Sequence, residues 1–323
     1  MPKILHTARY TGLPMDMLKK ACPDGFQVKT LDEATHEQLI IEARDADYFL
    51  VSGRLPIDKK VLDNSPRLKM IQRTGVGTDM LDIVEIKRRG IPVYVNAGIN
   101  ARSVAEHTLT LILASLKQLT KVNQQVHQGV WKKQQTGVGT HELYGKTVAL
   151  VGMGNIGRTV AEMLLPFGTN VIYTDVCRQK PEVETQLGLT FFDSFEAMLP
   201  QADILSFHCP LTQENMEILN KATLQKLKDG AIIINTARGK LINPDDLCDA
   251  LRVGHIRAAA LDTHYEEPIR EGYRLAGYDN VILTPHIGGL SYEAFEAMLV
   301  GAMDNIRAFD QGRLCEISEK RII

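Results

Sequence analysis

The chain has 323 residues, more than a single hydrophobic core usually organises, so its length predicts two domains. Its 44% hydrophobic and 24% charged residues are typical of a globular protein, which excludes the disordered and fibrous classes. The formal net charge of -2 gives no electrostatic reason to expect a nucleic acid or a membrane as partner. No apolar run can span a bilayer, and the five scattered cysteines form no CxxC pair. We therefore expect a cytoplasmic protein with reduced thiols and no metal site.

The first part of the chain alternates short apolar strands with amphipathic helices. We expect strands at residues 4–8, 27–30, 48–51, 70–72 and 93–95, separated by helices near 15–20, 37–43, 59–62 and 81–89. This βαβ rhythm predicts a parallel sheet covered by helices on both faces.

A second series of strands begins after a helix over residues 103–118 that is apolar nearly all round and should be buried between two bodies. A polar segment over residues 124–142 contains Trp131, and strands follow at 147–151, 170–174, 204–208, 231–235, 258–261 and 281–283. The last helix, residues 292–309, either extends this second domain or returns to the first. The fold class that we predict is α/β, with two doubly wound parallel sheets.

A glycine-rich loop directly follows the strand at 147–151 and opens a helix. It reads Gly152-Met153-Gly154-Asn155-Ile156-Gly157, and its G-x-G-x-x-G spacing in this context is typical of a dinucleotide-binding turn. Asp175 ends the next strand, near the spacing of about 20 residues expected for an acid that binds the ribose. The alternative is a purely structural turn. The acid predicts NAD rather than NADP, although Arg178 and Lys180 lie nearby.

Gly75-Val76-Gly77 is a second glycine pair, and it follows the strand at 70–72. Successive N–H groups of such a turn can bind an anion, but a simple tight turn explains the pattern equally well.

Polar residues with the chemistry for ketone reduction follow three later strands of the second series. Arg238, a glutamate of the pair Glu266-Glu267, and His286 are expected at one rim, because ligands bind at the carboxyl ends of the strands in a doubly wound sheet. The reaction needs a proton donor at the carbonyl oxygen, a cation that orients the substrate, and a carboxylate that favours the protonated imidazole. Taken singly, the arginine could be a surface ion pair and His286 a core histidine.

Several motifs in one order then resemble the D-isomer-specific 2-hydroxyacid dehydrogenases, the family of D-3-phosphoglycerate dehydrogenase, glycerate/hydroxypyruvate reductase and formate dehydrogenase. The similarity runs from about Val51 to about Ile306. Besides the glycine loop, it rests on Arg73-Thr74-Gly75-Val76-Gly77-Thr78-Asp79, Val104-Ala105-Glu106-His107-Thr108, His208-Cys209-Pro210-Leu211-Thr212, Asn235-Thr236-Ala237-Arg238-Gly239 and Thr284-Pro285-His286-Ile287-Gly288-Gly289.

This resemblance implies roles for individual residues. Arg238 would bind the substrate carboxylate and carbonyl, His286 would be the acid/base, and Glu267 would pair with it. The backbone of Val76 and Gly77 would bind the carboxylate. The residues implied at the cofactor are Gly152, Gly154, Asn155, Ile156, Gly157, Asp175, His208, Cys209, Thr236, Ala237, Asp262, Gly288 and Gly289.

The resemblance also implies a discontinuous organisation. A flavodoxin-like substrate-binding domain would comprise residues 1–98 and 292–323, and an inserted NAD-binding Rossmann domain would comprise residues 99–291. A homodimer would form through the NAD-binding domain and an arm around Trp131. One departure stands beside the nicotinamide site: the family's usual aliphatic–aromatic pair after Asp262 is Thr263-His264 here.

The substrate is the least determined property. Arg73 and Arg54 would be surplus for a singly charged keto acid, so they favour a 3-phosphoglycerate-like or other doubly anionic acid, with plain surface charge as the alternative. A glyoxylate or hydroxypyruvate reductase is the second interpretation. An NAD-sensing binding protein similar to the C-terminal-binding-protein corepressors is a third, and turnover of a 2-keto acid would separate it from an enzyme.

Overall fold

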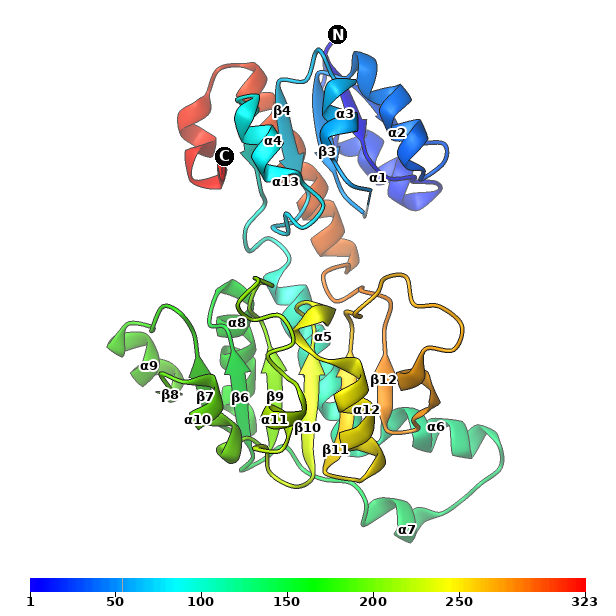
Figure 1. The fold of residues 1–323 in the computed structure, drawn as a ribbon, viewed down its shortest axis with the longest axis vertical. Coiled ribbons are helices and arrows are strands. Elements are labelled where there is room, and N and C mark those ends of the chain that lie inside the picture. Colours follow the sequence, from blue (N-terminus) through cyan, green and yellow to red (C-terminus); the bar gives the residue numbers. More distant parts are fainter. Residues whose placement is uncertain (54) are drawn as a thin grey trace. The chain divides into compact units, whose positions relative to one another are not determined.

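The computed structural model describes residues 1–53 and 55–323, so Arg54 lies outside the described residues. The chain forms two compact units (Figure 1). The first comprises Met1–Asn100 and Ser291–Ile323, and the second comprises Ala101–Leu290. Within the described part of the chain, no helix has the length and apolar character needed to cross a membrane.

The first unit is built on a five-stranded sheet of order β2-β1-β3-β4-β5, in which every pair is parallel. The strands are β1 (Lys3–His6), β2 (Gln27–Thr30), β3 (Tyr48–Val51), β4 (Met70–Arg73) and β5 (Val93–Tyr94). The helices are α1 (Leu13–Ala21), α2 (His36–Glu42), α3 (Lys59–Asp63), α4 (Ile83–Arg88) and α13 (Tyr292–Asp310). This strand order is that of flavodoxin-like folds and confirms the predicted class of this sheet.

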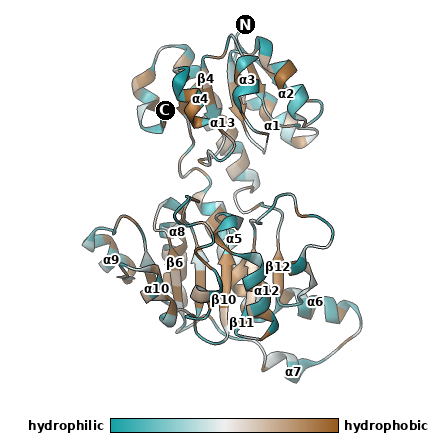
Figure 2. Ribbon diagram, in the orientation of Figure 1, coloured by the Kyte–Doolittle hydropathy of each residue, from teal (hydrophilic) through white to brown (hydrophobic). Residues whose placement is uncertain are grey.

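Helices cover both faces of this sheet, which explains why β3 is apolar throughout. Phe49 and Val51 pack into one core and Tyr48 and Leu50 into the other, because successive side chains of a strand point to opposite faces. The apolar strands appear brown in Figure 2. The final helix α13 lies in this unit, where residues such as Met303 pack against Tyr48, so the last helix returns to the first sheet.

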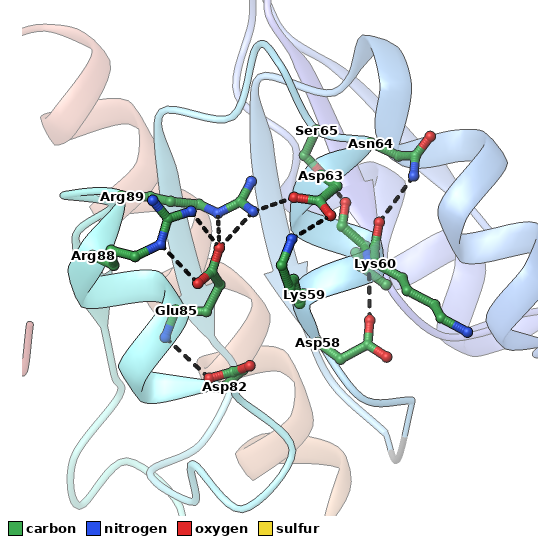
Figure 3. A network of polar contacts seen from close by, with 11 residues as sticks. Asp58, Lys59, Lys60, Asp63, Asn64, Ser65, Asp82, Glu85, Arg88 and Arg89 are labelled. Carbon is green, nitrogen blue, oxygen red and sulfur yellow. Dashed lines mark hydrogen bonds and ion pairs between the residues drawn. The ribbon is translucent and has the colours of Figure 1, made fainter.

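A polar network joins α3 and α4 on the surface of the first unit (Figure 3). Asp82 accepts a hydrogen bond from the Glu85 N–H at 3.0 Å and so caps α4. Hydrogen bonds from Arg88 and Arg89 lower the pKa of Glu85 to about 2, and Arg89 also pairs with Asp63 of α3. The charges therefore link the helices that follow β3 and β4.

The second unit is built on a seven-stranded parallel sheet of order β12-β11-β10-β9-β6-β7-β8. The strands are β6 (Thr147–Val151), β7 (Asn170–Thr174), β8 (Leu189–Phe191), β9 (Ile204–Phe207), β10 (Ala231–Asn235), β11 (Ile256–Leu261) and β12 (Val281–Leu283). Successive strands are added on one side of β6 up to β8 and on its other side from β9 onward. This change between β6 and β9 is the switch point of a Rossmann sheet and confirms the predicted class. Sequence reasoning missed β8, a three-residue edge strand.

Helices and short 3-10 turns connect these strands. The helices are α5 (Ala101–Lys117), α6 (Leu119–His127), α7 (Lys133–Gly137), α8 (Asn155–Leu164), α9 (Pro181–Leu187), α10 (Phe195–Met198), α11 (Lys221–Leu224) and α12 (Pro244–Arg252). Helix α5 packs on α8 and on β10 and β11. Arg102, Glu106 and Thr110 are exposed on its outer face, so the expected apolar surface covers one side of α5 only.

Candidate active site

The carboxyl edge of the second sheet gathers most of the residues singled out in the sequence. Parallel strands bring the segments that follow β6, β7, β9, β10, β11 and β12 to one edge. These segments contain the glycine loop, Asp175, His208-Cys209, Thr236–Arg238, Asp262 and His286. The topology therefore supports the prediction that these side chains belong to one site.

Two glycines of the loop after β6 are required by close backbone contacts. A Cβ at Gly157 would lie 2.1 Å from the carbonyl oxygen of Gly152, and a Cβ at Gly152 would lie 2.7 Å from the Cys209 nitrogen. Gly152 also has φ of +98°, a conformation that side chains rarely adopt. The loop thus packs directly on the segment after β9.

The N-terminus of α8 offers free donors beside this loop. Gly154 is the N-cap residue, and no side chain caps the helix, which begins at Asn155 and Ile156. Unpaired N–H groups and the helix dipole favour an anion at such a terminus. The loop and helix therefore fit the pyrophosphate of a dinucleotide.

Asp175 lies immediately after β7 and faces the same loop. Its carboxylate accepts hydrogen bonds from the Met153 N–H at 2.5 Å and the Cys177 N–H at 2.9 Å. Arg178 is turned to another partner, since its guanidinium pairs with Glu184 at 2.8 Å. A carboxylate beside the glycine loop suits a ribose hydroxyl, and Arg178 is paired with Glu184, so the residues fit NAD.

The segment after β9 supplies neutral groups. Burial lowers the pKa of His208 to about 3, and its Nε2 contacts Ser206 Oγ at 2.9 Å. Burial also raises the pKa of the Cys209 thiol to about 11, so the cysteine is a thiol rather than a thiolate at neutral pH.

Asp262, after β11, is a buried carboxylate whose oxygens are both occupied. Thr284 Oγ1 donates at 2.6 Å and the backbone N–H groups of Ile287 and Gly288 at 2.9 and 2.8 Å. Burial alone would raise the pKa of Asp262, but bonds from His107, Thr284 and the two backbone groups outweigh it and lower that pKa to about 2. A charged Asp262 thus fixes the turn that carries His286 to Gly288.

His286 and Glu267 form a direct pair. His286 Nδ1 lies 2.9 Å from Glu267 Oε2, whereas the other carboxylate oxygen accepts the His264 N–H at 2.8 Å. The His286 side chain is 42% exposed and the Glu267 side chain 16%, so the imidazole reaches solvent while its carboxylate partner is largely covered. Of the adjacent acids Glu266 and Glu267, the geometry selects Glu267.

The segment after β10 carries Arg238 in a turn that side-chain hydrogen bonds hold in place. Asn235 of β10 holds this turn, since its side chain donates to the Arg238 carbonyl at 2.8 Å and accepts the Ala237 N–H at 3.0 Å. Arg238 Nη1 donates to the Ala237 carbonyl at 2.8 Å. Thr236 Oγ1 contacts Thr108 Oγ1 at 3.0 Å, which joins this turn to α5.

Three of the four residues expected to bind substrate lie at or just after the end of β4 in the first unit. Val76 is half exposed, and Gly77 comes next in the chain. Arg73 Nη1 donates to the Val51 carbonyl at 3.3 Å, so its guanidinium lies against the end of β3. The fourth expected residue, Arg54, lies outside the described residues.

Residues of α5 join the site although sequence reasoning gave them no role. His107 Nε2 lies 3.1 Å from Thr284 Oγ1 and 3.4 Å from Asp262 Oδ1. The available signal was the resemblance motif over residues 104–108, which contains His107 and Thr108. Over residues 1–53 and 55–323, no group of three or more His, Cys, Asp or Glu is arranged to hold a metal ion.

Comparison with known proteins identifies the family of this chain. Residues 109–288 match the family described as D-isomer specific 2-hydroxyacid dehydrogenase, NAD binding domain. The chain is 37% identical to a glyoxylate reductase of Aeropyrum pernix over 97% of its own length and 94% of the relative's. It is 36% identical to a D-3-phosphoglycerate dehydrogenase of Mycobacterium leprae, over 89% of this chain and only 53% of that protein.

A solved structure shows the same fold with ligands. D-lactate dehydrogenase from Aquifex aeolicus, complexed with NAD and lactic acid, superimposes with a TM-score of 0.84 at 27% identity, over 99% of this chain and 98% of that one. The named relatives are dehydrogenases and reductases, which favours the enzyme over the corepressor-like interpretation.

Proposed function

Because the chain belongs to the D-isomer specific 2-hydroxyacid dehydrogenase family and is an NAD-dependent oxidoreductase, we propose that Arg238, Glu267 and His286 catalyse the interconversion of a D-2-hydroxy acid and its 2-keto acid. The observation that carries this assignment is the 2.9 Å contact between His286 and Glu267, with the second carboxylate oxygen fixed by a backbone N–H. An acid/base group held by a carboxylate is what carbonyl reduction requires.

Arg238, Glu267 and His286, called the trio below, each have one task. In reduction, protonated His286 donates from Nε2 to the carbonyl oxygen, and Glu267 stabilises the imidazolium. In oxidation, neutral His286 accepts the hydroxyl proton. Arg238 orients the substrate carboxylate by charge-assisted hydrogen bonds. Bound at this edge, the nicotinamide cofactor would supply the hydride acceptor for C2 of the hydroxy acid and, in its reduced form, the hydride donor for the keto acid.

The cofactor would be held along the carboxyl edge of the second sheet. Gly152, Gly154, Asn155, Ile156 and Gly157 form the turn and helix start that suit the pyrophosphate, and Asp175 suits the ribose. His208, Cys209, Thr236 and Ala237 are proposed along the cofactor. Asp262, Gly288 and Gly289 are proposed nearer the nicotinamide.

The substrate best supported is a small, singly charged 2-keto acid of the glyoxylate class. Relatives matched over nearly their full length are named glyoxylate reductases. In addition, Arg73 donates to the Val51 carbonyl, which gives this arginine a structural task in the first unit. Val76 and Gly77 are proposed to bind the carboxylate through their backbone.

A second candidate is a doubly anionic substrate such as a phosphorylated or dicarboxylic 2-keto acid. The similarity to a D-3-phosphoglycerate dehydrogenase and the arginine at position 73 favour it. It requires Arg73 or Arg54 to meet a second negative group.

Steady-state reduction with NADH tests the proposal and separates the candidates. Glyoxylate, hydroxypyruvate, phosphohydroxypyruvate, 2-ketoglutarate and a branched 2-keto acid would be compared by kcat/KM. We expect glyoxylate or hydroxypyruvate to give the highest value. A higher value for phosphohydroxypyruvate would establish the second candidate, and no turnover of any 2-keto acid would contradict the enzyme assignment and favour an NAD-sensing binding protein.

We propose that residues 1–98 and 292–323, which all lie in the first unit, form the substrate-binding domain and that residues 99–291 form the NAD-binding domain. We also propose a cytoplasmic homodimer. Trp131, Tyr144 and Val138 are 79%, 77% and 85% exposed in and beside the arm, which is unusual for apolar side chains and suits burial by a second copy. Light scattering of the purified protein would measure its mass.

A further inference from the structure

His264 lies in the loop between Asp262 and Glu267 and has no task in the reaction proposed above. Its side chain is 7% exposed, and its ring packs edge-to-face on Tyr273 with centroids 5.6 Å apart. The family resemblance places an aromatic residue at this position. A phenyl ring would fill the same space, but the imidazole adds a hydrogen-bond donor.

That donor reaches the segment that carries His286. His264 Nε2 lies 2.8 Å from the Thr284 carbonyl oxygen, and a carbonyl only accepts, so Nε2 bears the proton. The other ring nitrogen, Nδ1, is buried and has no hydrogen-bond partner in the described part of the chain. The backbone N–H of His286 donates to the same carbonyl at 3.0 Å. One oxygen atom therefore links the two histidines.

The linked turn is one that needs support. His286 has φ of +59°, in the left-handed region that non-glycine residues rarely occupy. Such a conformation costs free energy and persists where neighbouring groups hold it. The two bonds to the Thr284 carbonyl are placed to hold the turn and so to orient the imidazole.

The backbone of His264 contacts Glu267 and the residue that follows Arg238. Its N–H donates to Glu267 Oε1 at 2.8 Å. A Cβ at Gly239, next to Arg238, would lie 2.0 Å from the carbonyl carbon of His264, so the two backbones touch. Movement of His264 would displace the segments of all three proposed catalytic residues.

We infer that His264 is a positioning residue, which orients His286 through the Thr284 carbonyl and holds Glu267 through its own N–H. The inference rests on the proposed function of the trio. The imidazole of His264 transfers no proton to the substrate in this role, because the ring is buried and its contacts are with Thr284 and Tyr273.

Two substitutions of His264 separate the effect of its hydrogen-bond donor from the effect of its ring shape. His264→Phe keeps the aromatic contact and removes the donor, whereas His264→Gln keeps a donor of similar reach. We expect His264→Phe to lower kcat for reduction by about tenfold, the loss of one hydrogen bond, with the Kd of NADH unchanged. His264→Gln should restore kcat to within about twofold of the parent protein.

A second measurement does not depend on turnover. The ring signals of His286 would be followed by NMR against pH in the cofactor-free protein, and His264→Phe should shift their titration midpoint. Tyr273→Phe, which keeps the ring against His264 and retains the His264 donor to Thr284, is the matched control and should change neither kcat nor the midpoint. His264→Asn, too short to reach the carbonyl, replaces His264→Phe if the latter does not fold.

The outcomes are distinct. An unchanged kcat and an unchanged His286 midpoint in the variant without the donor would overturn the inference, as would a parallel loss of NADH binding. If the parent protein turns over no 2-keto acid, the proposed function fails, and the NMR measurement alone still decides whether His264 orients His286.

Discussion

The carboxyl edges of the two parallel sheets carry different chemistry although both sheets are doubly wound. In the second unit, Asp175, Asp262 and Glu267 each accept backbone N–H groups of the loops at that edge. In the first unit, His6 and Ser52 form a neutral pair at 2.5 Å, because burial lowers the pKa of His6 to about 4. The two sheets share an architecture, and the residues placed at the strand ends decide whether an edge carries carboxylates or a neutral pair.

The two edges also differ in whether they hold charged groups in fixed positions. A carboxylate that accepts backbone N–H groups is fixed in place and stays ionised, which suits a group that must hold a cofactor or an imidazolium. A buried neutral pair stabilises the loop it joins but offers no charge to a ligand. Substitutions at the second edge should therefore affect catalysis far more than substitutions at the first.

The largest effect should follow from His286→Ala. Loss of the proton donor should reduce the kcat of keto acid reduction by about 10²–10⁴-fold. NADH binding, measured by fluorescence titration, should survive, because the glycine loop and Asp175 are untouched. Near-normal turnover in this variant would show that the proton comes from another group.

Glu267→Gln should change the pH dependence. The carboxylate favours the protonated imidazole, and reduction needs that form, so removal of the charge should move the alkaline limit of kcat/KM for reduction to lower pH. Oxidation needs the neutral imidazole and should shift its acid limit in the same direction. A pH profile identical to that of the parent protein would exclude the pair from catalysis.

Asp175→Ala should reduce the preference for NADH over NADPH. The parent protein should prefer NADH over NADPH, since a carboxylate binds ribose hydroxyls and repels a phosphate. Loss of a charge-assisted hydrogen bond of roughly 1.5–3 kcal/mol corresponds to about one to two decades of affinity for NADH. The ratio of kcat/KM for the two cofactors measures the change. Equal ratios in parent and variant would contradict the ribose assignment.

The smallest effect is expected in the first unit, for Arg73→Ala. If its guanidinium serves the end of β3, the KM ratio of phosphohydroxypyruvate to hydroxypyruvate should change by less than about threefold, since no charge-assisted bond to substrate is lost. A rise in that ratio of about one to two decades would show that Arg73 binds a second negative group. The comparison of the two edges would then need revision.

Much of this site follows from local sequence. The glycine spacing, the acid after β7 and the strand-by-strand placement of Arg238 and His286 are set by backbone sterics and by the rule that ligands bind at carboxyl ends of parallel strands. The resemblance already selected Glu267 and included His107 in a motif, but the contacts of Glu267 with His264 and of His107 with Asp262 were beyond sequence reasoning. They depend on which side chains the loops after β11 and β12 and helix α5 bring together.

The sequence by itself determined two parallel α/β sheets and a dinucleotide turn, because hydrophobic periodicity and glycine positions act over a few residues. Only the tertiary structure decided that Arg178 is paired with Glu184 and leaves Asp175 facing the loop, and that the Thr284 carbonyl joins His264 to His286. These outcomes depend on segments far apart in the chain, whose contacts are set by packing rather than by local pattern.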